Sequence, residues 1–178
     1  MTEFDKLYLS VDTYCGLCCA ECEFKETMNC GGCIATGGKP FHGSCNLADC
    51  AISRGRKFCG ECEDFACELL KSYSNDPEHG DTPPGARIEN CSKVKAALVR
   101  AAREGVDPMG VCGNDCDDCP YTQWCGGCRS QYPHCSFGTL YEDKRCPNVT
   151  CAGERGVYAC KDCPEREACE RGFFGRDK

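Results

Sequence analysis

The sequence predicts a small, mostly irregular protein with short α-helices, organised as two tandem cysteine-rich, zinc-knuckle-like lobes that metal ions hold together. Three observations support this fold class. Cysteine accounts for 23 of the 178 residues, many cysteines stand in Cys-x2-Cys pairs, and most of their spacing occurs twice along the chain. Apart from cysteine, about 50 residues are hydrophobic, roughly 28% of the chain. Lobes with so few large apolar side chains bury little core, so they depend on cross-links or metals.

The repeat begins with two runs that each open on Cys-Gly. The shared cysteines are Cys15, Cys19 and Cys22 in the first run and Cys112, Cys116 and Cys119 in the second. Each half continues with a Cys-Gly-Gly-Cys pair, two cysteines five residues apart, a further Cys-x2-Cys pair and a final cysteine. These are Cys30, Cys33, Cys45, Cys50, Cys59, Cys62 and Cys67, and then Cys125, Cys128, Cys146, Cys151, Cys160, Cys163 and Cys169. Ten cysteines per half therefore correspond, which predicts a tandem duplication.

Each half also contains twelve candidate metal ligands. Cys18 and Cys135 have no counterpart in the other half, and they bring the cysteines to 11 on each side. His42 and His134 complete two sets of twelve, and His42 forms a His-x2-Cys pair with Cys45. Twelve ligands divide into three tetrahedral sites of the closed nitrogen and sulfur type that structural zinc prefers. The chain would then hold several zinc ions, up to about six.

The predicted domains are a first lobe at residues 1–73, a connecting segment at 74–110 and a second lobe at 111–178. The start of the connecting segment is rich in Pro, Gly and Asp, which predicts an exposed loop. An amphipathic helix follows, capped by Ser92 and stopped by Gly105. Cys91 lies on this connecting segment and is set aside from the ligand count.

Shorter elements are predicted inside the lobes. The alternation at residues 7–11 favours a short strand or an extended lead-in. Start and stop signals favour helices at 47–54 and 63–71 and a helical turn at 164–171. The glycines inside the two Cys-Gly-Gly-Cys pairs suit tight knuckles, in which backbone N–H groups turn toward the thiolates.

Charge and hydropathy exclude several classes of protein. The net charge is −7, and residues 1–91 hold 8 Lys and Arg against 15 Asp and Glu, while the remainder holds 13 of each. This distribution argues against nucleic acid as a partner, because phosphate backbones are bound by clustered basic side chains. The N-terminus lacks the apolar core of a signal peptide, and no run reaches transmembrane length. We therefore expect a cytoplasmic protein without membrane contact, whose thiols stay reduced.

Zinc and iron–sulfur are the two main interpretations of the cysteines. The Cys-x3-Cys-x2-Cys run that opens each half is also the three-thiolate pattern that holds a four-iron cluster in radical S-adenosylmethionine enzymes, but the large α/β barrel of those enzymes is missing. Small electron carriers and a thiolate metal store remain further alternatives. No phosphate loop and no nucleophile with a spaced His or Asp partner is present, so no catalytic residue is assigned.

The pattern of the first half resembles the cysteine-rich domain of unknown function 3795. The resemblance is carried by Cys15-Gly16-Leu17-x-Cys19-x2-Cys22, Cys30-Gly31-Gly32-Cys33, Cys45-x4-Cys50-Ala51, Cys59-x2-Cys62 and Phe65-Ala66-Cys67-Glu68-Leu69. It covers residues 14–105, and residues 111–172 look like a diverged copy. The family often has Cys where His42 stands, which implies that His42 is a ligand. The resemblance implies metal binding in an anaerobic or reducing cytoplasm and supplies no reaction.

These observations predict a multi-site zinc-binding protein that acts as a structural or interaction module for an unidentified protein partner. The alternative is a protein with [4Fe-4S] clusters that serves electron transfer or is an accessory subunit of an anaerobic redox enzyme.

Overall fold

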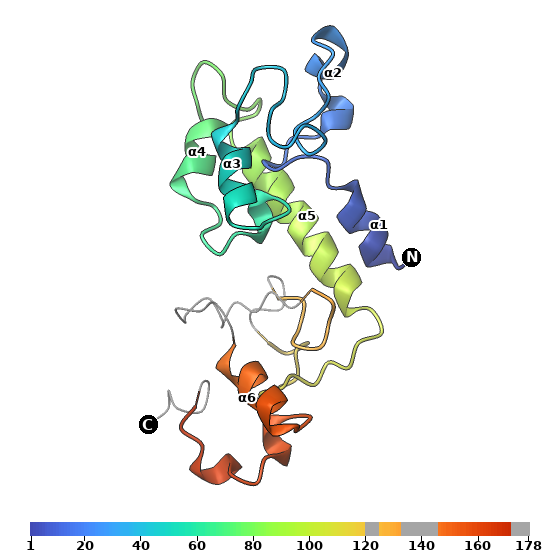
Figure 1. The fold of residues 1–178 in the computed structure, drawn as a ribbon, viewed down its shortest axis with the longest axis vertical. Helices are drawn as coiled ribbons and strands as arrows, with labels where there is room; N and C mark the ends of the chain where they lie inside the picture. Colours follow the sequence, from blue (N-terminus) through green and yellow to red (C-terminus); the bar gives the residue numbers. More distant parts are fainter. Residues whose placement is uncertain (120–124, 133–145, 172–178) are drawn as a thin grey trace. The chain divides into compact units, whose positions relative to one another are not determined.

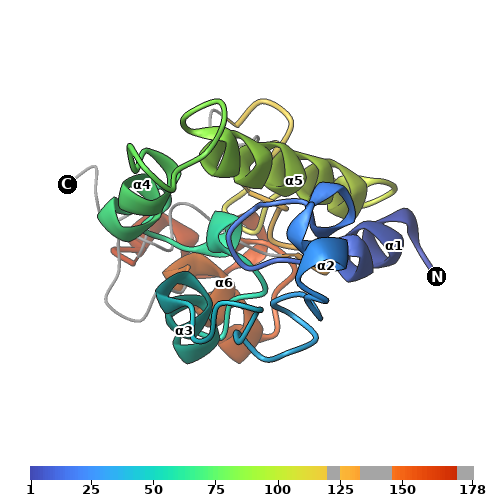
Figure 2. The ribbon, with the colours of Figure 1, turned by 90° about the horizontal axis from the view of Figure 1, so that it is seen from above.

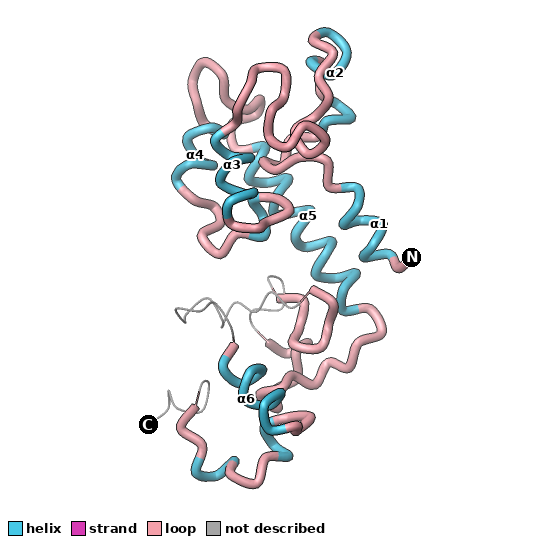
Figure 3. The backbone as a smooth tube through the Cα atoms, in the orientation of Figure 1, coloured by secondary structure: helices cyan, strands magenta, loops and turns pink. Residues whose placement is uncertain are grey.

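The computed structural model describes residues 1–119, 125–132 and 146–171. Within these ranges the chain consists of short helices joined by irregular segments (Figures 1 and 3), and the only β-type pairing there is an isolated bridge between Met109 and Asp115. The expected class of a small, mostly irregular protein with short helices is confirmed. Metal stapling and the two zinc-knuckle-like lobes remain predictions.

The chain divides into two compact units, Met1–Ala97 and Leu98–Lys178, which we call the first and the second unit. The first unit contains α1 (Glu3–Ser10), η1 (Cys19–Glu21), α2 (Phe24–Thr27), α3 (Asn46–Ser53), η2 (Cys59–Glu61) and α4 (Glu68–Ser74). The second contains α6 (Pro147–Arg155), η4 (Cys160–Asp162) and η5 (Arg166–Ala168). The longest helix, α5 (Ala86–Arg103), begins in the first unit and ends in the second.

Each unit has a small core of its own. In the first unit, Leu47 of α3, Phe58 and Leu70 of α4 are at most 2% exposed. In the second unit, Leu98 and Val99 of α5 are buried together with Ala159. Cores of this size agree with the low content of large apolar residues and leave little hydrophobic stabilisation per residue.

The prediction of a strand or extended segment at residues 7–11 is wrong, because residues 3–10 form α1. The side chain of Thr2 accepts a hydrogen bond from the Asp5 backbone N–H at 3.1 Å, and the Thr2 N–H donates to the Asp5 carboxylate at 2.8 Å. This capping box starts a helix. The helix is further supported by Phe4 and Tyr8, whose rings stack one turn apart at 5.5 Å.

The helix expected at 47–54 is confirmed as α3, which ends just before Gly55 with φ +62°. The helix expected at 63–71 begins later, because the backbone after Cys62 turns first and α4 starts only after Cys67. The helical turn expected at 164–171 is reduced to the single turn of η5.

The connecting helix α5 begins at Ala86, before the expected cap at Ser92, whose hydroxyl donates instead to the Ile88 carbonyl one turn earlier at 3.0 Å. The preceding loop is also less exposed than expected. Asp81 is only 1% exposed at its side chain and forms an ion pair with Arg87 at 3.0 Å. Figures 1 and 2 show α4 beside the start of α5, where Arg87 also donates to the Tyr73 carbonyl at 2.8 Å. Among the described residues, no helix has the length and hydropathy that crossing a membrane requires.

Candidate functional site

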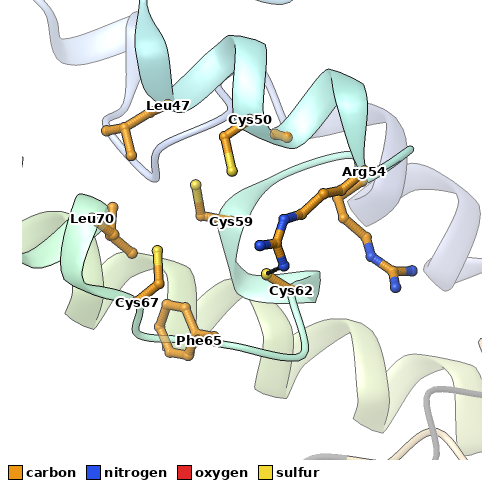
Figure 4. A pocket seen from close by; sticks show the side chains of 10 residues that line it. Leu47, Cys50, Arg54, Cys59, Cys62, Phe65, Cys67 and Leu70 are labelled. Carbon is orange, nitrogen blue, oxygen red and sulfur yellow. Dashed lines mark hydrogen bonds between the residues drawn. The ribbon is translucent and has the colours of Figure 1, made fainter. Parts of the chain in front are cut away.

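Four cysteines of the first unit line one void of about 20 Å³. They are Cys50, Cys59, Cys62 and Cys67 (Figure 4). Cys50 lies on α3, Cys59 begins η2, Cys62 ends it, and Cys67 immediately precedes α4. Figure 4 shows the sulfurs of Cys50, Cys59 and Cys67 directed toward the space between α3 and α4. We call these four residues the first-unit cluster.

Backbone hydrogen bonds fix the loop that carries the central pair. The Cys59 N–H donates to the Tyr14 carbonyl at 2.7 Å, and the Cys62 N–H donates to the Cys59 carbonyl at 3.0 Å. These bonds hold both ends of the Cys-x2-Cys turn. A Cys-x2-Cys turn is the element by which a metal knuckle presents two thiolates to one ion.

The void is lined by apolar residues and two arginines besides the cysteines. The apolar residues include Leu47, Phe65 and Leu70, and the arginines are Arg54 and Arg56. Burial raises the pKa of the Cys59 thiol well above its ordinary value, and the neighbouring thiols of Cys91 and Cys15 add to that effect. A thiolate in such surroundings is costly unless a cation lies next to it.

One cation of the chain already lies against this cluster. The Arg54 guanidinium donates from Nη1 to the Cys62 sulfur at 3.4 Å (Figure 4). The same nitrogen donates to the Asp64 carboxylate at 2.7 Å. Burial raises the pKa of Cys62, while the Asp64 backbone N–H and the charge of Arg54 lower it. Arg54 therefore favours the thiolate form of one cysteine in the set.

The second unit has a matching void of about 20 Å³, also lined by four cysteines. They are Cys151, Cys160, Cys163 and Cys169, which we call the second-unit cluster. The first three stand 101 positions after Cys50, Cys59 and Cys62. The supporting bonds also correspond, since the Cys160 N–H donates to the Val111 carbonyl at 2.8 Å and the Cys163 N–H donates to the Cys160 carbonyl at 3.2 Å.

The remaining predicted ligands of the first unit gather near the Cys-Gly-Gly-Cys pair. Cys33 accepts a hydrogen bond from the Tyr14 N–H at 3.4 Å. Burial raises its pKa to about 11, and the charges of Cys15, Cys19 and Cys45 act in the same direction. These thiols therefore lie within electrostatic reach of one another. Burial also raises the pKa of the Cys19 thiol, and the charges of Cys22 and Cys30 raise it further.

In the second unit, the sulfurs of Cys112 and Cys116 both lie close to Gly110, where an added Cβ would meet them at 3.3 and 3.4 Å. Burial raises the pKa of the Cys116 thiol, and the charge of Cys119 raises it further. The Gly127 N–H donates to the Cys125 sulfur at 3.4 Å, and Gly127 has φ +87°. That left-handed backbone explains why glycine occupies this position, and the bond is the N–H to sulfur contact expected of a knuckle.

The predicted ligands without a counterpart are less clearly placed. Cys18 is exposed, and His42 is exposed with its ring edge-on to Phe41 at 5.2 Å. His134 and Cys135 lie outside the described residues. None of the 22 described cysteines forms a disulfide. Within the same residues, no group of three or more His, Cys, Asp or Glu side chains converges as the ligands of a single ion would.

Sequence reasoning missed two features of the clusters. Cys91 is fully buried, and an added Cβ at Gly16 would meet its sulfur at 2.6 Å, so it packs against the first Cys-Gly run. Arg54 was not singled out either, although its position four residues after Cys50 recurs as Arg155 after Cys151. Comparison of the two halves beyond the cysteines would have revealed this arginine.

Comparison with known proteins supports the resemblance over part of the chain. Residues 11–72 match the family described as "Protein of unknown function (DUF3795)". The match contains the first Cys-Gly run, the Cys-Gly-Gly-Cys pair and the whole first-unit cluster, and it ends before the loop and helix to which the resemblance was extended. No curated protein and no solved structure matches the chain.

Proposed function

We propose that this protein is a multi-site zinc-binding module whose cysteine clusters hold structural metal ions, and that it acts by binding another protein. The observation that carries the proposal is the four-cysteine void, which occurs in both units on corresponding elements. Cysteines brought together from α3, η2 and the start of α4 are distant enough in sequence for one ion to connect all three elements.

The chemistry of the donors fits a soft cation. Thiolates are the preferred ligands of zinc in structural sites, where four of them surround the ion at about 2.3 Å. In the proposed sites the sulfurs close on the ion by rotation of cysteine side chains, each of which has a single χ angle. The thiol of Cys59 would release its proton to solvent when a dication binds beside it, and the charge of the dication would offset the cost of the thiolate in these apolar surroundings.

Zinc is favoured over an iron–sulfur cluster at these two voids because each contains a Cys-x2-Cys turn among four cysteines, the ligand pattern of closed structural zinc sites. The Cys15, Cys19 and Cys22 run keeps the iron–sulfur alternative open for a separate site, since three thiolates at this spacing also hold a four-iron cluster.

The paired features of the two halves support an origin by duplication. In both clusters the first cysteine lies on a helix that is followed by a left-handed glycine, Gly55 with φ +62° and Gly156 with φ +65°. Both also use a Cys-x2-Cys turn anchored to the Cys-Gly run of the same unit. We therefore propose that each unit holds the same kind of metal sites, up to three per unit if every predicted ligand is used.

A role in protein binding is supported by an exposed aromatic group in the first unit. The rings of Phe24 and Phe41 stack at 4.9 Å, yet each residue is more than 40% exposed. A zinc ion with four protein ligands has no open position for water, so structural stabilisation is the role that such sites serve. We place the protein in a reducing cytoplasm, where these thiols stay available for metal.

The proposal is tested by purifying the protein without oxygen and measuring zinc, iron and acid-labile sulfide per chain. We expect a colourless protein with at least two zinc ions, one for each four-cysteine cluster. A brown protein in which iron and sulfide replace zinc would overturn the assignment in favour of the iron–sulfur alternative.

A further inference from the structure

The two four-cysteine clusters share an alanine and an arginine besides their sulfurs, and they differ at other lining positions. Leu47 and Phe65 of the first void have the counterparts Asn148 and Arg166, 101 positions later, while Arg56 has the apolar counterpart Val157. Arg171 also lines the second void, two residues after Cys169, where the first unit has Leu69 after Cys67. The two voids thus have the same sulfurs but different hydrogen-bond donors around them.

In the second-unit cluster, side chains donate toward three of the four sulfurs. The Asn148 amide donates to Cys160 at 3.6 Å, and the Arg171 guanidinium donates to Cys151 at 3.7 Å. The Arg155 guanidinium approaches Cys163 at 4.0 Å while its other terminal nitrogen holds Glu165 at 2.7 Å. Asn148 is 3% exposed, so its amide is fixed against the sulfur rather than free in solvent.

In the first-unit cluster, Arg54 at 3.4 Å from Cys62 is the one side-chain donor to a sulfur among the described residues. Leu47 and Leu69 occupy the positions of Asn148 and Arg171 and have no polar hydrogen to donate. Leu47 and Leu70, which line the first void, are at most 2% exposed. These two leucines therefore cover the first cluster, whereas Arg171 beside the second cluster is exposed.

Hydrogen bonds to a metal-bound thiolate change the strength of the metal–sulfur bond. A donor draws electron density from the sulfur, so the thiolate becomes less basic and binds the ion less strongly. Cationic donors have the larger effect, because charge-assisted bonds are roughly twice as strong as neutral ones. An apolar cover has the opposite effect, because it keeps competing water and chelators away from the ion.

From these differences we infer that the two clusters are functionally inequivalent: the first-unit cluster holds a permanent structural ion, and the second-unit cluster is an exchangeable zinc site. The inference rests on the proposed function, since it assumes that both clusters bind zinc. Asn148 and Arg171 set the difference, because their counterparts in the first unit are leucines. The second unit thereby gives up its zinc to a stronger chelator while the first unit keeps its own.

The test follows which cysteines become free as zinc is removed. Zinc-loaded protein is mixed with EDTA in the presence of N-ethylmaleimide, and the labelled cysteines are identified by peptide mass spectrometry over time. We expect Cys151 and Cys160 to be labelled about tenfold faster than Cys50 and Cys59, a factor that corresponds to ~1.4 kcal/mol. Equal labelling rates for the two clusters would overturn the inference.

A double variant, Asn148→Leu with Arg171→Leu, installs the first-unit residues in the second unit. It should slow the labelling of the second-unit cluster about tenfold and leave the first-unit cluster unchanged. The control is Arg100→Leu, which removes an exposed cation of the same unit that donates to none of the four sulfurs. If the double variant and the control give the same rate, the donors do not set the exchange.

The outcomes separate this inference from the proposed function. Protein that contains no zinc and is labelled at once without EDTA contradicts the proposed function. Protein that binds zinc in both units but releases it from them at one rate contradicts only the inference. If the double variant fails to fold, the comparison of Cys160 with Cys59 in the unchanged protein still decides the question.

Discussion

Replacing Cys59 by Ala separates metal binding from simple packing. As a packing change, the loss of one buried sulfur costs about 1 kcal/mol in the free energy of unfolding. As the loss of a zinc ligand, it costs much more, because structural zinc contributes an apparent ~10–16 kcal/mol in small zinc-dependent domains. We therefore expect Cys59→Ala to lower the free energy of unfolding by more than about 4 kcal/mol, a size reached by few mechanisms besides metal loss.

The matched control is Cys91→Ala, which removes a sulfur that is more deeply buried than that of Cys59 and is not among the four lining the void. Urea unfolding followed by circular dichroism gives the two stabilities, and elemental analysis gives zinc per chain. Cys59→Ala should lose about one zinc ion, and Cys91→Ala should lose none and be destabilised by only about 1 kcal/mol. Equal destabilisation of the two variants with unchanged zinc would refute the reasoning.

Three further predictions concern the frame around the clusters and are checked by urea or thermal unfolding of the zinc-loaded protein. Asp81→Asn should lower the free energy of unfolding by about 3–5 kcal/mol, because it leaves the buried guanidinium of Arg87 without its charged partner. The control Glu89→Gln, in an exposed ion pair, should lower it by no more than about 0.5 kcal/mol. Similar losses in the two variants would contradict the importance of the buried pair. Gly16→Ala should lower the free energy of unfolding by about 1–3 kcal/mol more than Gly43→Ala. Both glycines have positive φ, but of the two only Gly16 has other atoms where a Cβ would be added, at 2.6 Å. Equal losses in the two variants would contradict the close packing around Gly16. Burial raises the pKa of Cys91 from 9.0 to about 12, so the unfolded chain loses this proton at a lower pH than the folded chain. The stability that the protonated thiol contributes is complete below pH 9 and declines as the pH rises toward 12. Cys91→Ala should therefore lose less stability than the unchanged protein over that range, and an identical alkaline profile would contradict this prediction.

The helices that the sequence predicted well are those with local stop signals. Gly55 ends α3 in a left-handed conformation, and this position needs no tertiary information to identify. The start of α4 was misplaced because the turn after Cys62 uses residues that resemble a helix start in isolation. The strand expected at residues 7–11 failed for a similar reason, since the capping box of Thr2 and Asp5 outweighs a short alternation.

The clusters were predictable as a set of cysteines but not as separate sites. Spacing alone does not reveal that Cys50 and Cys67 line the same void as the intervening Cys-x2-Cys pair, because their approach depends on how α3 and α4 pack. The contacts of Asn148 and Arg171 with sulfur were equally inaccessible, because no spacing pattern indicates that a polar side chain in the first turn of α6 or after Cys169 contacts a sulfur. Their meaning emerges only when the two units are compared position by position.

The central claim, that the cysteine clusters hold zinc through thiolates, is tested most directly by X-ray absorption at the zinc edge on protein purified without oxygen. We predict a first shell dominated by sulfur at about 2.3 Å, with about four ligands per ion. A shell of nitrogen and oxygen, or a protein that carries iron with iron–iron scattering in place of zinc, would contradict it.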